Sequence, residues 1–393
     1  MKTTGALNGL RVLDCTHVLA GAWCSLILAD LGADVIKIEP LSGDLTRGQP
    51  DNPFKAFDFV NRNKRAITVD ITSPEGADVM RRLAKDADIF VENYRPGVMA
   101  KAGLDYKALA EINPRLIYAS VSGFGQTGPY RNRGGLDLVA HAMSGIMSYV
   151  GDPNSTRPSS TAVPIADLNA GTFAALGILA AVHHRTTTGE GQYVETSLLE
   201  AAAAYTVWES GMFLTTGTVA KRNGSRHRLA APYEALKTED GYLVVGVSNQ
   251  KLWGRLCEAL DQPGLADDPN FKRPSLRLTN RDALQAKLES VLARNTTAYW
   301  VEKIAGKGVP CGPINDIGQA LSDPQLTDRK FLAEVDERRF PRTPLTLSKT
   351  PVAVSRGPAM LGQHTREVLA AAGFDADAID RLVQSGIVSE PRV

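Results

Sequence analysis

The stretch LRVLDCTHVLAGAWCSLILADLGADVIKIE, residues 10–39, decides the fold of this chain. It contains a short apolar run at 10–14, a helical pattern at 22–31 and a second short apolar run at 35–38. This alternation is typical of a parallel β-α-β unit. It continues with strand-like runs at 67–70, 89–91 and 116–121 and helical patterns at 74–85 and 136–147. The sequence therefore predicts an α/β fold with a parallel sheet and helices on both faces.

The second half of the chain changes in character near Gly217. Before this point, residues 192–196 indicate another strand and 198–214 an alanine-rich helix; after it, 218–228 is polar. Residues 233–247 alternate like an antiparallel pair around the turn Glu239-Asp240-Gly241, and amphipathic helices are expected at 281–293 and 298–307. We expect a large domain, 1–216 plus 329–393, and a smaller α+β domain, 217–328.

Composition excludes several classes of protein. The 393 residues suggest two domains, and a net charge of +1 without a basic block argues against a nucleic-acid or membrane-surface partner. The four cysteines show no C-x-x-C spacing, and no basic region followed by an apolar run stands at the N-terminus. We expect a cytoplasmic protein without a metal site. The longest apolar run, 172–182, is too short for a membrane span.

Asp167 lies in the segment VPIADLNAG, residues 163–171, directly before that apolar run. The run is most simply a buried helix, with an extended segment ending near Ala166, which places Asp167 at a helix N-terminus. Unpaired backbone N–H groups there would keep its carboxylate ionised and available for chemistry. The structural alternative is a helix cap, because Asp is a favoured residue at that position.

Gly123, Gly125 and Gly128 form a G-x-G-x-x-G pattern after a predicted strand. In a dinucleotide-binding fold the third glycine opens a helix that receives the pyrophosphate. Here residues 129–135 continue as a loop, and the pattern follows the wrong strand, because residues 15–21 after the first strand lack it. A nicotinamide-dependent enzyme is therefore disfavoured.

An ordered set of segments resembles the class III coenzyme A transferases, the family of formyl-CoA, carnitine and succinate–hydroxymethylglutarate CoA-transferases. The segments are 7–14, 28–40, 61–65, 91–97, 120–130 and 163–171, and the likeness extends from Leu7 to about Val388. The succinate–hydroxymethylglutarate branch looks closest, through 231–235, 240–246 and 312–315. The resemblance implies a Rossmann-like large domain and an interlocked, ring-like homodimer.

The resemblance also implies a coenzyme site. Carried over residue by residue, it comprises Val18, Ala20, Val69, Asn93, Tyr94, Arg95 and Lys101. Val69 and Tyr94 could form a wall for the adenine, and Asn93, Arg95 and Lys101 could donate to the phosphates. Arg95 and Lys101 could instead be ordinary solvated charges. Formyl-CoA transferase differs where this chain has Leu19, Pro40 and Thr72, so its substrate contacts are not carried over.

The implied reaction moves CoA from an acyl-CoA to a free carboxylic acid, and a dicarboxylic acid is expected. Asp167 would attack the donor thioester, giving an aspartyl anhydride and then an aspartyl-CoA thioester. The CoA thioester is the substrate, and no further cofactor is expected. Backbone N–H groups near Asp167 and in the loop 123–128 are the candidates for stabilising the oxyanions.

Two alternatives stay open. Related 2-methylacyl-CoA racemases typically have Gly-His-Asp where this chain has Gly135-Leu136-Asp137, and a leucine cannot move a proton. A non-catalytic CoA-binding protein is the other alternative. His17, His141 and the segment 223–227 are candidates for binding an acceptor carboxylate, whereas the adjacent pair at 183–184 points in different directions and suits no metal.

Overall fold

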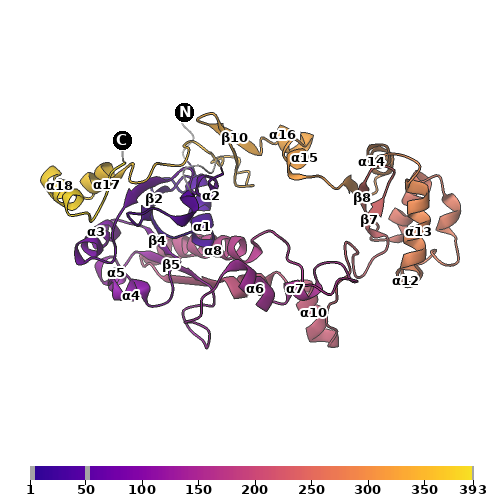
Figure 1. Cartoon of the computed structure of the whole chain (residues 1–393), viewed down its shortest axis with the longest axis horizontal. Helices are drawn as coiled ribbons and strands as arrows, with labels where there is room; N and C mark the ends of the chain where they lie inside the picture. The colour runs from indigo at the N-terminus through magenta and orange to yellow at the C-terminus, as the bar shows by residue number, and fades with distance from the viewer. Residues whose placement is uncertain (1–4, 49–53, 392–393) are drawn as a thin grey trace. The chain divides into compact units, whose positions relative to one another are not determined.

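The computed structural model describes residues 5–48 and 54–391. The chain folds into two compact units (Figure 1). Unit 1 comprises Met1–Met147, Ser160–Thr218 and Thr327–Val393; unit 2 comprises Ser148–Ser159 and Val219–Leu326. The segment Ser148–Ser159, which the sequence placed in the large domain, thus groups with unit 2.

Unit 1 is built on a six-stranded parallel sheet in the order β3-β2-β1-β4-β5-β6. The strands are β1 (Arg11–Cys15), β2 (Asp34–Glu39), β3 (Arg65–Thr68), β4 (Ile89–Glu92), β5 (Ile117–Ser122) and β6 (Tyr193–Ser197). Leu13 of β1 pairs with Ile36 on one side and Phe90 on the other. This strand order is that of the doubly wound folds, in which ligands bind where the order reverses, at the carboxyl ends of the strands. The predicted parallel sheet is confirmed.

Helices cover both faces of this sheet (Figure 1). On one face, apolar side chains of α3 (Pro74–Lys85), α5 (Tyr106–Ile112), α17 (Thr365–Ala371) and α18 (Ala376–Gln384) share a core with the strands. On the other face lie α1 (Ala20–Asp30) and α8 (Ile165–Thr188), which pack against each other. A methyl group at Gly171 of α8 would collide with the carbonyl oxygen of Ala20, so glycine is what permits this close approach.

The long helix α8 passes the length and hydropathy test for a membrane span. It nevertheless packs on α1, α9 (Leu198–Ala204), β5 and β6, and it buries Ala166, Ala170, Ala174 and Ile178. These contacts are those of a core helix within unit 1.

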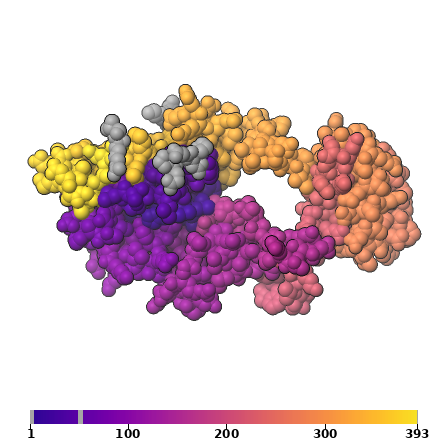
Figure 2. All heavy atoms as spheres, viewed as in Figure 1, coloured from indigo at the N-terminus to yellow at the C-terminus, as the bar shows by residue number. Residues whose placement is uncertain are grey.

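The C-terminal segment returns to the N-terminal strands, as Figure 2 shows where the yellow residues meet the indigo ones. The backbone N–H of Ala66 in β3 donates to His364 Nδ1 at 3.1 Å, and the N–H of His364 donates back to the Ala66 carbonyl at 2.9 Å. The Ser389 N–H donates to Thr68 Oγ1 at 2.7 Å. The edge strand β3 is thereby covered, which protects it from pairing with another chain.

Unit 2 contains the antiparallel pair β7 (Tyr233–Lys237) and β8 (Tyr242–Gly246), as predicted, with β9 (Cys311–Pro313) added on the other side of β8. Its core includes Trp253, Leu256, Leu288 and Trp300. The helices are α11 (Gln250–Ala259), α12 (Pro274–Thr279), α13 (Arg281–Leu292), α14 (Thr297–Gly306) and α15 (Ile317–Leu321). The sequence analysis found α13 and α14 but missed α11.

Three helix predictions need correction. Residues 136–147 form two helices, α6 (Asp137–Met143) and α7 (Ile146–Tyr149), because Gly145 adopts a φ of +92° between them. Residues 198–214 are divided into α9 and α10 (Val207–Thr216). The helix expected from 172 begins at Ile165, so Ala166 is helical rather than extended. The remaining elements are α2 (Ala56–Val60), α4 (Val98–Lys101), α16 (Pro324–Asp328), β10 (Leu332–Val335), β11 (Arg338–Pro341), η1 (Leu45–Arg47) and η2 (Pro263–Ala266).

Candidate active site

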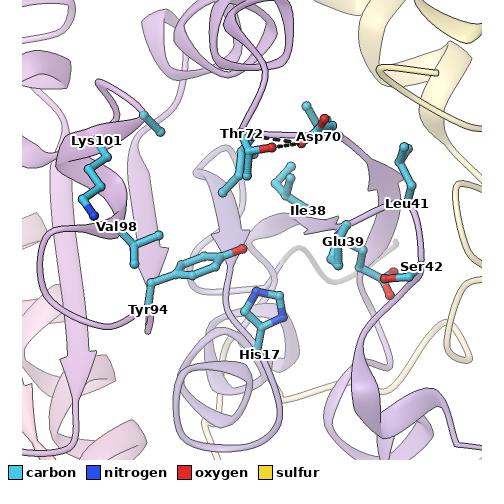
Figure 3. A pocket seen from close by; sticks show the side chains of 14 residues that line it. His17, Ile38, Glu39, Leu41, Ser42, Asp70, Thr72, Tyr94, Val98 and Lys101 are labelled. Carbon is cyan, nitrogen blue, oxygen red and sulfur yellow. Dashed lines mark hydrogen bonds between the residues drawn. The ribbon is translucent and has the colours of Figure 1, made fainter. Parts of the chain in front are cut away.

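A cavity of about 740 Å³ lies at the carboxyl ends of β2, β3 and β4 (Figure 3). Its walls come from the end of β2, from the segments that follow β1, β2, β3 and β4, and from α4: His17, Ile38, Glu39, Pro40, Leu41, Ser42, Val69, Asp70, Ile71, Thr72, Tyr94, Val98, Lys101 and Ala102. The volume is within the range of pockets that hold cofactor-sized ligands. The position is the one that the strand order predicts for a ligand.

The loop between β1 and α1 forms one side of this cavity. Asn93 fixes it, because its side-chain amide accepts from the His17 N–H at 2.7 Å and donates to the His17 carbonyl at 2.8 Å. The His17 ring meets the Tyr94 ring edge to face, with centroids 4.7 Å apart, and both point into the cavity in Figure 3. Burial, with a contribution from Lys37, lowers the pKa of His17, so its imidazole is neutral at pH 7.

The structure brings some of the expected coenzyme residues together and separates others. Val69, Tyr94 and Lys101 line the one cavity. The Asn93 amide is already used by the His17 backbone, so its part is to shape the loop. Arg95 lines a different cavity, of about 330 Å³, together with Glu92, Lys107 and Gln126 among others.

Val18 and Ala20 frame the β1–α1 loop. The Val18 side chain is 44% exposed, whereas Ala20 is buried at the start of α1, under Gly171. The sequence analysis missed most of the cavity wall. Among the missed residues are Ile38, near the end of β2, and Asp70 and Ile71, shortly after the end of β3. Their position at strand ends was the signal that could have found them.

Buried charges under the loop were also missed. The Lys64 ammonium lies 2.9 Å from Asp14 Oδ2, and that of Lys37 lies 3.6 Å from Asp14 Oδ1. Burial alone would raise the pKa of Asp14, but Lys37, Lys64 and hydrogen bonds from Ser25 and Thr16 hold it well below its usual range. Burial lowers the pKa of Lys64 to about 8. Asp14 and Lys37, which are charged residues inside otherwise apolar strands, were the available signal.

Asp167 lies in the first turn of α8, close to the predicted position. Asp137 of α6 occupies the neighbouring helix terminus: its Oδ1 accepts from the N–H groups of Ala166 at 2.8 Å and Asp167 at 3.1 Å. Burial, and secondly the charge of Asp137, raises the pKa of Asp167 to about 7. The expectation that free N–H groups keep Asp167 ionised is therefore wrong, because Asp137 binds those groups and adds a repelling charge.

The second turn of α8 packs against the start of α1, which directly follows the β1–α1 loop. Gly171, one turn after Asp167, touches Ala20, and Trp23 Nε1 donates to Thr172 Oγ1 at 3.1 Å. Asp167 therefore lies one helical turn from the contact between α8 and the start of α1.

The glycine-rich loop has a packing role. A Cβ on Gly123 would lie 2.6 Å from the Cα of Gly135, so the two glycines bring the end of β5 against the start of α6. No helix begins at Gly128, which agrees with the rejection of a dinucleotide turn. The N–H of Gly125 donates to Ser122 Oγ at 3.0 Å and that of Gln126 to Glu195 Oε1 at 2.6 Å. These expected oxyanion donors are thus already engaged.

The other histidines are dispersed. His141 is buried on α6, four residues after Asp137, and its Nε2 has no hydrogen-bond partner within the described ranges 5–48 and 54–391. His183 and His184 are exposed on α8. His227 lies in unit 2, stacked on Tyr233, and its Nδ1 accepts from the Leu229 N–H.

Fold and site define a doubly wound domain with a nucleotide-sized cavity at its strand ends and a half-buried carboxyl group in the first turn of α8. Residues 7–365 match CoA-transferase family III, and the chain belongs to this family. It is 38% identical to succinyl-CoA:glutarate CoA-transferase of Mus musculus, over 98% of this chain and 90% of that protein. It is 36% identical to succinate–glutarate CoA-transferase of Agrobacterium fabrum, over 93% and 95%. A CAIB/BAIF family protein from Brucella suis has a similar structure, with a TM-score of 0.86 and 35% identity over 94% and 100% of the chains. The chain is a class III CoA-transferase.

Proposed function

We propose that this enzyme transfers CoA from an acyl-CoA donor to a free dicarboxylic acid through a covalent intermediate on Asp167. The observation that carries the proposal is the half-buried carboxyl group of Asp167, one helical turn before Gly171, which touches Ala20 at the start of α1. The relatives named for glutarate support a dicarboxylic acid as acceptor. Leu136 speaks against racemase chemistry, because its side chain cannot take up the α-proton.

The reaction proceeds by four acyl transfers. A carboxylate oxygen of Asp167 attacks the thioester carbon, the C–S bond breaks, and CoA leaves as a thiolate. The thiolate attacks the aspartyl carbonyl of the anhydride, and the donor acid leaves as a carboxylate. The acceptor carboxylate then attacks the aspartyl-CoA thioester and releases the thiolate. The thiolate finally attacks the acceptor's acyl carbon, which gives the new acyl-CoA and frees Asp167.

The surroundings of Asp167 suit these steps. With a pKa of about 7, the group is ionised in about half of the molecules at neutral pH and is then a poorly solvated nucleophile. Partial burial also keeps water away from the anhydride, which would otherwise hydrolyse.

In this proposal CoA binds in the large cavity. Val69 and Tyr94 supply apolar and aromatic surface for the adenine, and Lys101 supplies a cation for the phosphates. Val18 and Ala20, which follow the cavity-lining His17 along the chain, are proposed to contact the coenzyme, while Asn93 holds the shape of the loop. Arg95, on the other cavity, is available to a more distant part of the coenzyme. The CoA thioester needs no additional cofactor, and a cytoplasmic location fits such a metabolite.

The enzyme is proposed to act as an interlocked, ring-like homodimer. In unit 1, large apolar side chains are exposed: Leu136 is 73%, Val207 67%, Trp208 76% and Leu214 82% exposed. The last three lie on α10, which buries no residue in the chain by itself. A soluble protein covers such a surface with a partner, and most partners are second copies of the chain. Sedimentation on dilution tests this: a folded monomer would contradict it.

The activity is tested by mixing the purified protein with succinyl-CoA or acetyl-CoA and a panel of free acids, and measuring new thioesters by mass. Dicarboxylic acids such as glutarate and oxalate are the expected acceptors, with monocarboxylic acids of similar length as the control. Hydroxylamine added after the donor alone should leave a hydroxamate at residue 167. Transfer to no acid at all would contradict the proposal and favour a non-catalytic CoA-binding protein.

A further inference from the structure

Val18, which follows the cavity-lining residue His17, has an unusual backbone. Its φ is +60°, in the left-handed region, and its side chain is branched at Cβ. This conformation is rare for such a residue and costs on the order of 1–3 kcal/mol, so the surroundings must hold it in place. Strain of this kind concentrates at ligand-binding and catalytic sites.

The holding contacts come from β2 and from the segments that follow β2 and β4. The N–H of Val18 donates to Asp44 Oδ2 at 3.1 Å. The preceding residue, His17, is bound through both backbone groups by Asn93, and the Thr16 carbonyl accepts from the Lys37 ammonium. Lys37 in turn lies 3.7 Å from Asp44. Backbone groups of three successive loop residues are therefore bound by buried or half-buried side chains.

Asp44 is itself rigidly placed. Its Oδ1 accepts from the N–H of Thr46 at 2.8 Å and from the Thr46 hydroxyl at 2.6 Å. Its own N–H donates to Glu39 Oε2 at 3.0 Å, and the Arg47 guanidinium binds both oxygens of Glu39. Burial would raise the pKa of Asp44, but Lys37 and the hydrogen bonds from Thr46 and Val18 lower it, so the group carries a charge at neutral pH.

We propose that Asp44 is a positioning residue that holds Val18 in the left-handed conformation and thereby keeps the β1–α1 loop in the shape that admits CoA. The inference rests on the proposed function, because it takes CoA as the ligand of the cavity. Asp44 acts through Val18: the described residues that line the cavity include Glu39 and Ser42 but not Asp44. Its contribution is to have the strained loop ready before the ligand arrives.

A glycine at position 18 tests this directly, because glycine adopts a positive φ without strain. The dissociation constant of CoA is measured by calorimetry for four proteins: wild type, Asp44→Asn, Val18→Gly and the double variant. Asp44→Asn weakens binding about tenfold when residue 18 is valine, the effect of losing part of one charge-assisted hydrogen bond. In the Val18→Gly background the same change weakens binding no more than about threefold, because glycine adopts this conformation without backbone strain and does not need Asp44 to maintain it. The kcat of Asp44→Asn at saturating acyl-CoA stays within about threefold of wild type, since bound CoA restores the loop.

Glu337→Gly is the matched control. Glu337 has a φ of +61°, is exposed, and lies in the turn between β10 and β11, away from the loop. In this background Asp44→Asn keeps its full tenfold effect. If Asp44→Asn does not fold, Asp44→Ser, which retains an oxygen for Thr46, takes its place in the same cycle.

Equal effects of the Asp44 substitution in the valine and glycine backgrounds overturn the inference, and so does a loss in kcat without a loss of affinity. These outcomes leave the proposed function standing. A wild-type protein that does not bind CoA overturns both together.

Discussion

The negative charge on Asp167 lowers the stability of the folded protein, and replacing Asp167 by asparagine removes that charge. The pKa of this carboxyl group rises from 3.8 to about 7, first through burial and then through Asp137. A carboxyl group with a raised pKa binds its proton more tightly in the folded state. Stability is therefore lost as pH rises from 4 to 7. At 1.36 kcal/mol per unit the shift amounts to about 4 kcal/mol, and partial solvent access reduces this to roughly 2 kcal/mol. Asparagine has a similar shape but does not ionise, so the variant does not lose this stability as the pH rises.

The free energy of unfolding is measured in urea at pH 5 and pH 8 for wild type and Asp167→Asn. The variant should gain roughly 1–2 kcal/mol relative to wild type between these two pH values, because most of the ionisation of Asp167 falls between them. Transfer activity should fall more than about a hundredfold in the same protein, since asparagine cannot form the anhydride. Asp86→Asn, at an exposed residue that ends α3, is the control and should show neither effect.

Two results would refute this reasoning. A stability difference that does not depend on pH would show that the ionisation of Asp167 does not destabilise the folded protein. Residual transfer above about a hundredth of the wild-type rate would show that no covalent step passes through residue 167, whatever the stability measurement gives.

Two further predictions concern the same domain. Asp137→Asn can still accept from the N–H groups of α8 but carries no charge, so the pKa of Asp167 should fall; the midpoint of kcat/KM against pH should move below about 7, and an unchanged midpoint would contradict the electrostatic role of Asp137. Lys101→Met should raise the dissociation constant of CoA about fivefold to tenfold at low salt and less at high salt, because a phosphate loses a cation. Lys85→Met, at the exposed last residue of α3, is its control, and equal effects of the two substitutions would remove Lys101 from the phosphate site.

The parallel sheet could be predicted because its signal is local. Short apolar runs separated by helices mark β1, β2, β4 and β5 to within about a residue, and Pro74 after Ser73 marks the start of α3. The breaks inside residues 136–147 and 198–214 were missed, since neither stretch contains a proline to end the helix. The apolar residues of α11 recur at helical spacing in the sequence, so this helix could have been predicted.

The coenzyme residues show the limit of a motif. Asn93, Tyr94 and Arg95 are consecutive, yet the first binds the His17 backbone, the second lines the large cavity and the third lines another. A motif gives the order of residues along the chain, whereas side-chain directions change from one residue to the next where a strand ends. Only the folded loop shows which of the three can meet a ligand in the large cavity.

The proton affinity of Asp167 could not be predicted locally for a related reason. A carboxylate in the first turn of a helix normally has its charge stabilised by free N–H groups. Here a residue thirty positions earlier competes for them: Asp137 takes the N–H groups of Ala166 and Asp167. Asp137 starts α6, and the contact of Gly123 with Gly135 brings the end of β5 against that start. The glycine pattern that resembles a dinucleotide turn and the carboxyl group proposed as nucleophile therefore belong to one arrangement. In it, close backbone packing sets the position of Asp137, and burial together with Asp137 raises the pKa of Asp167.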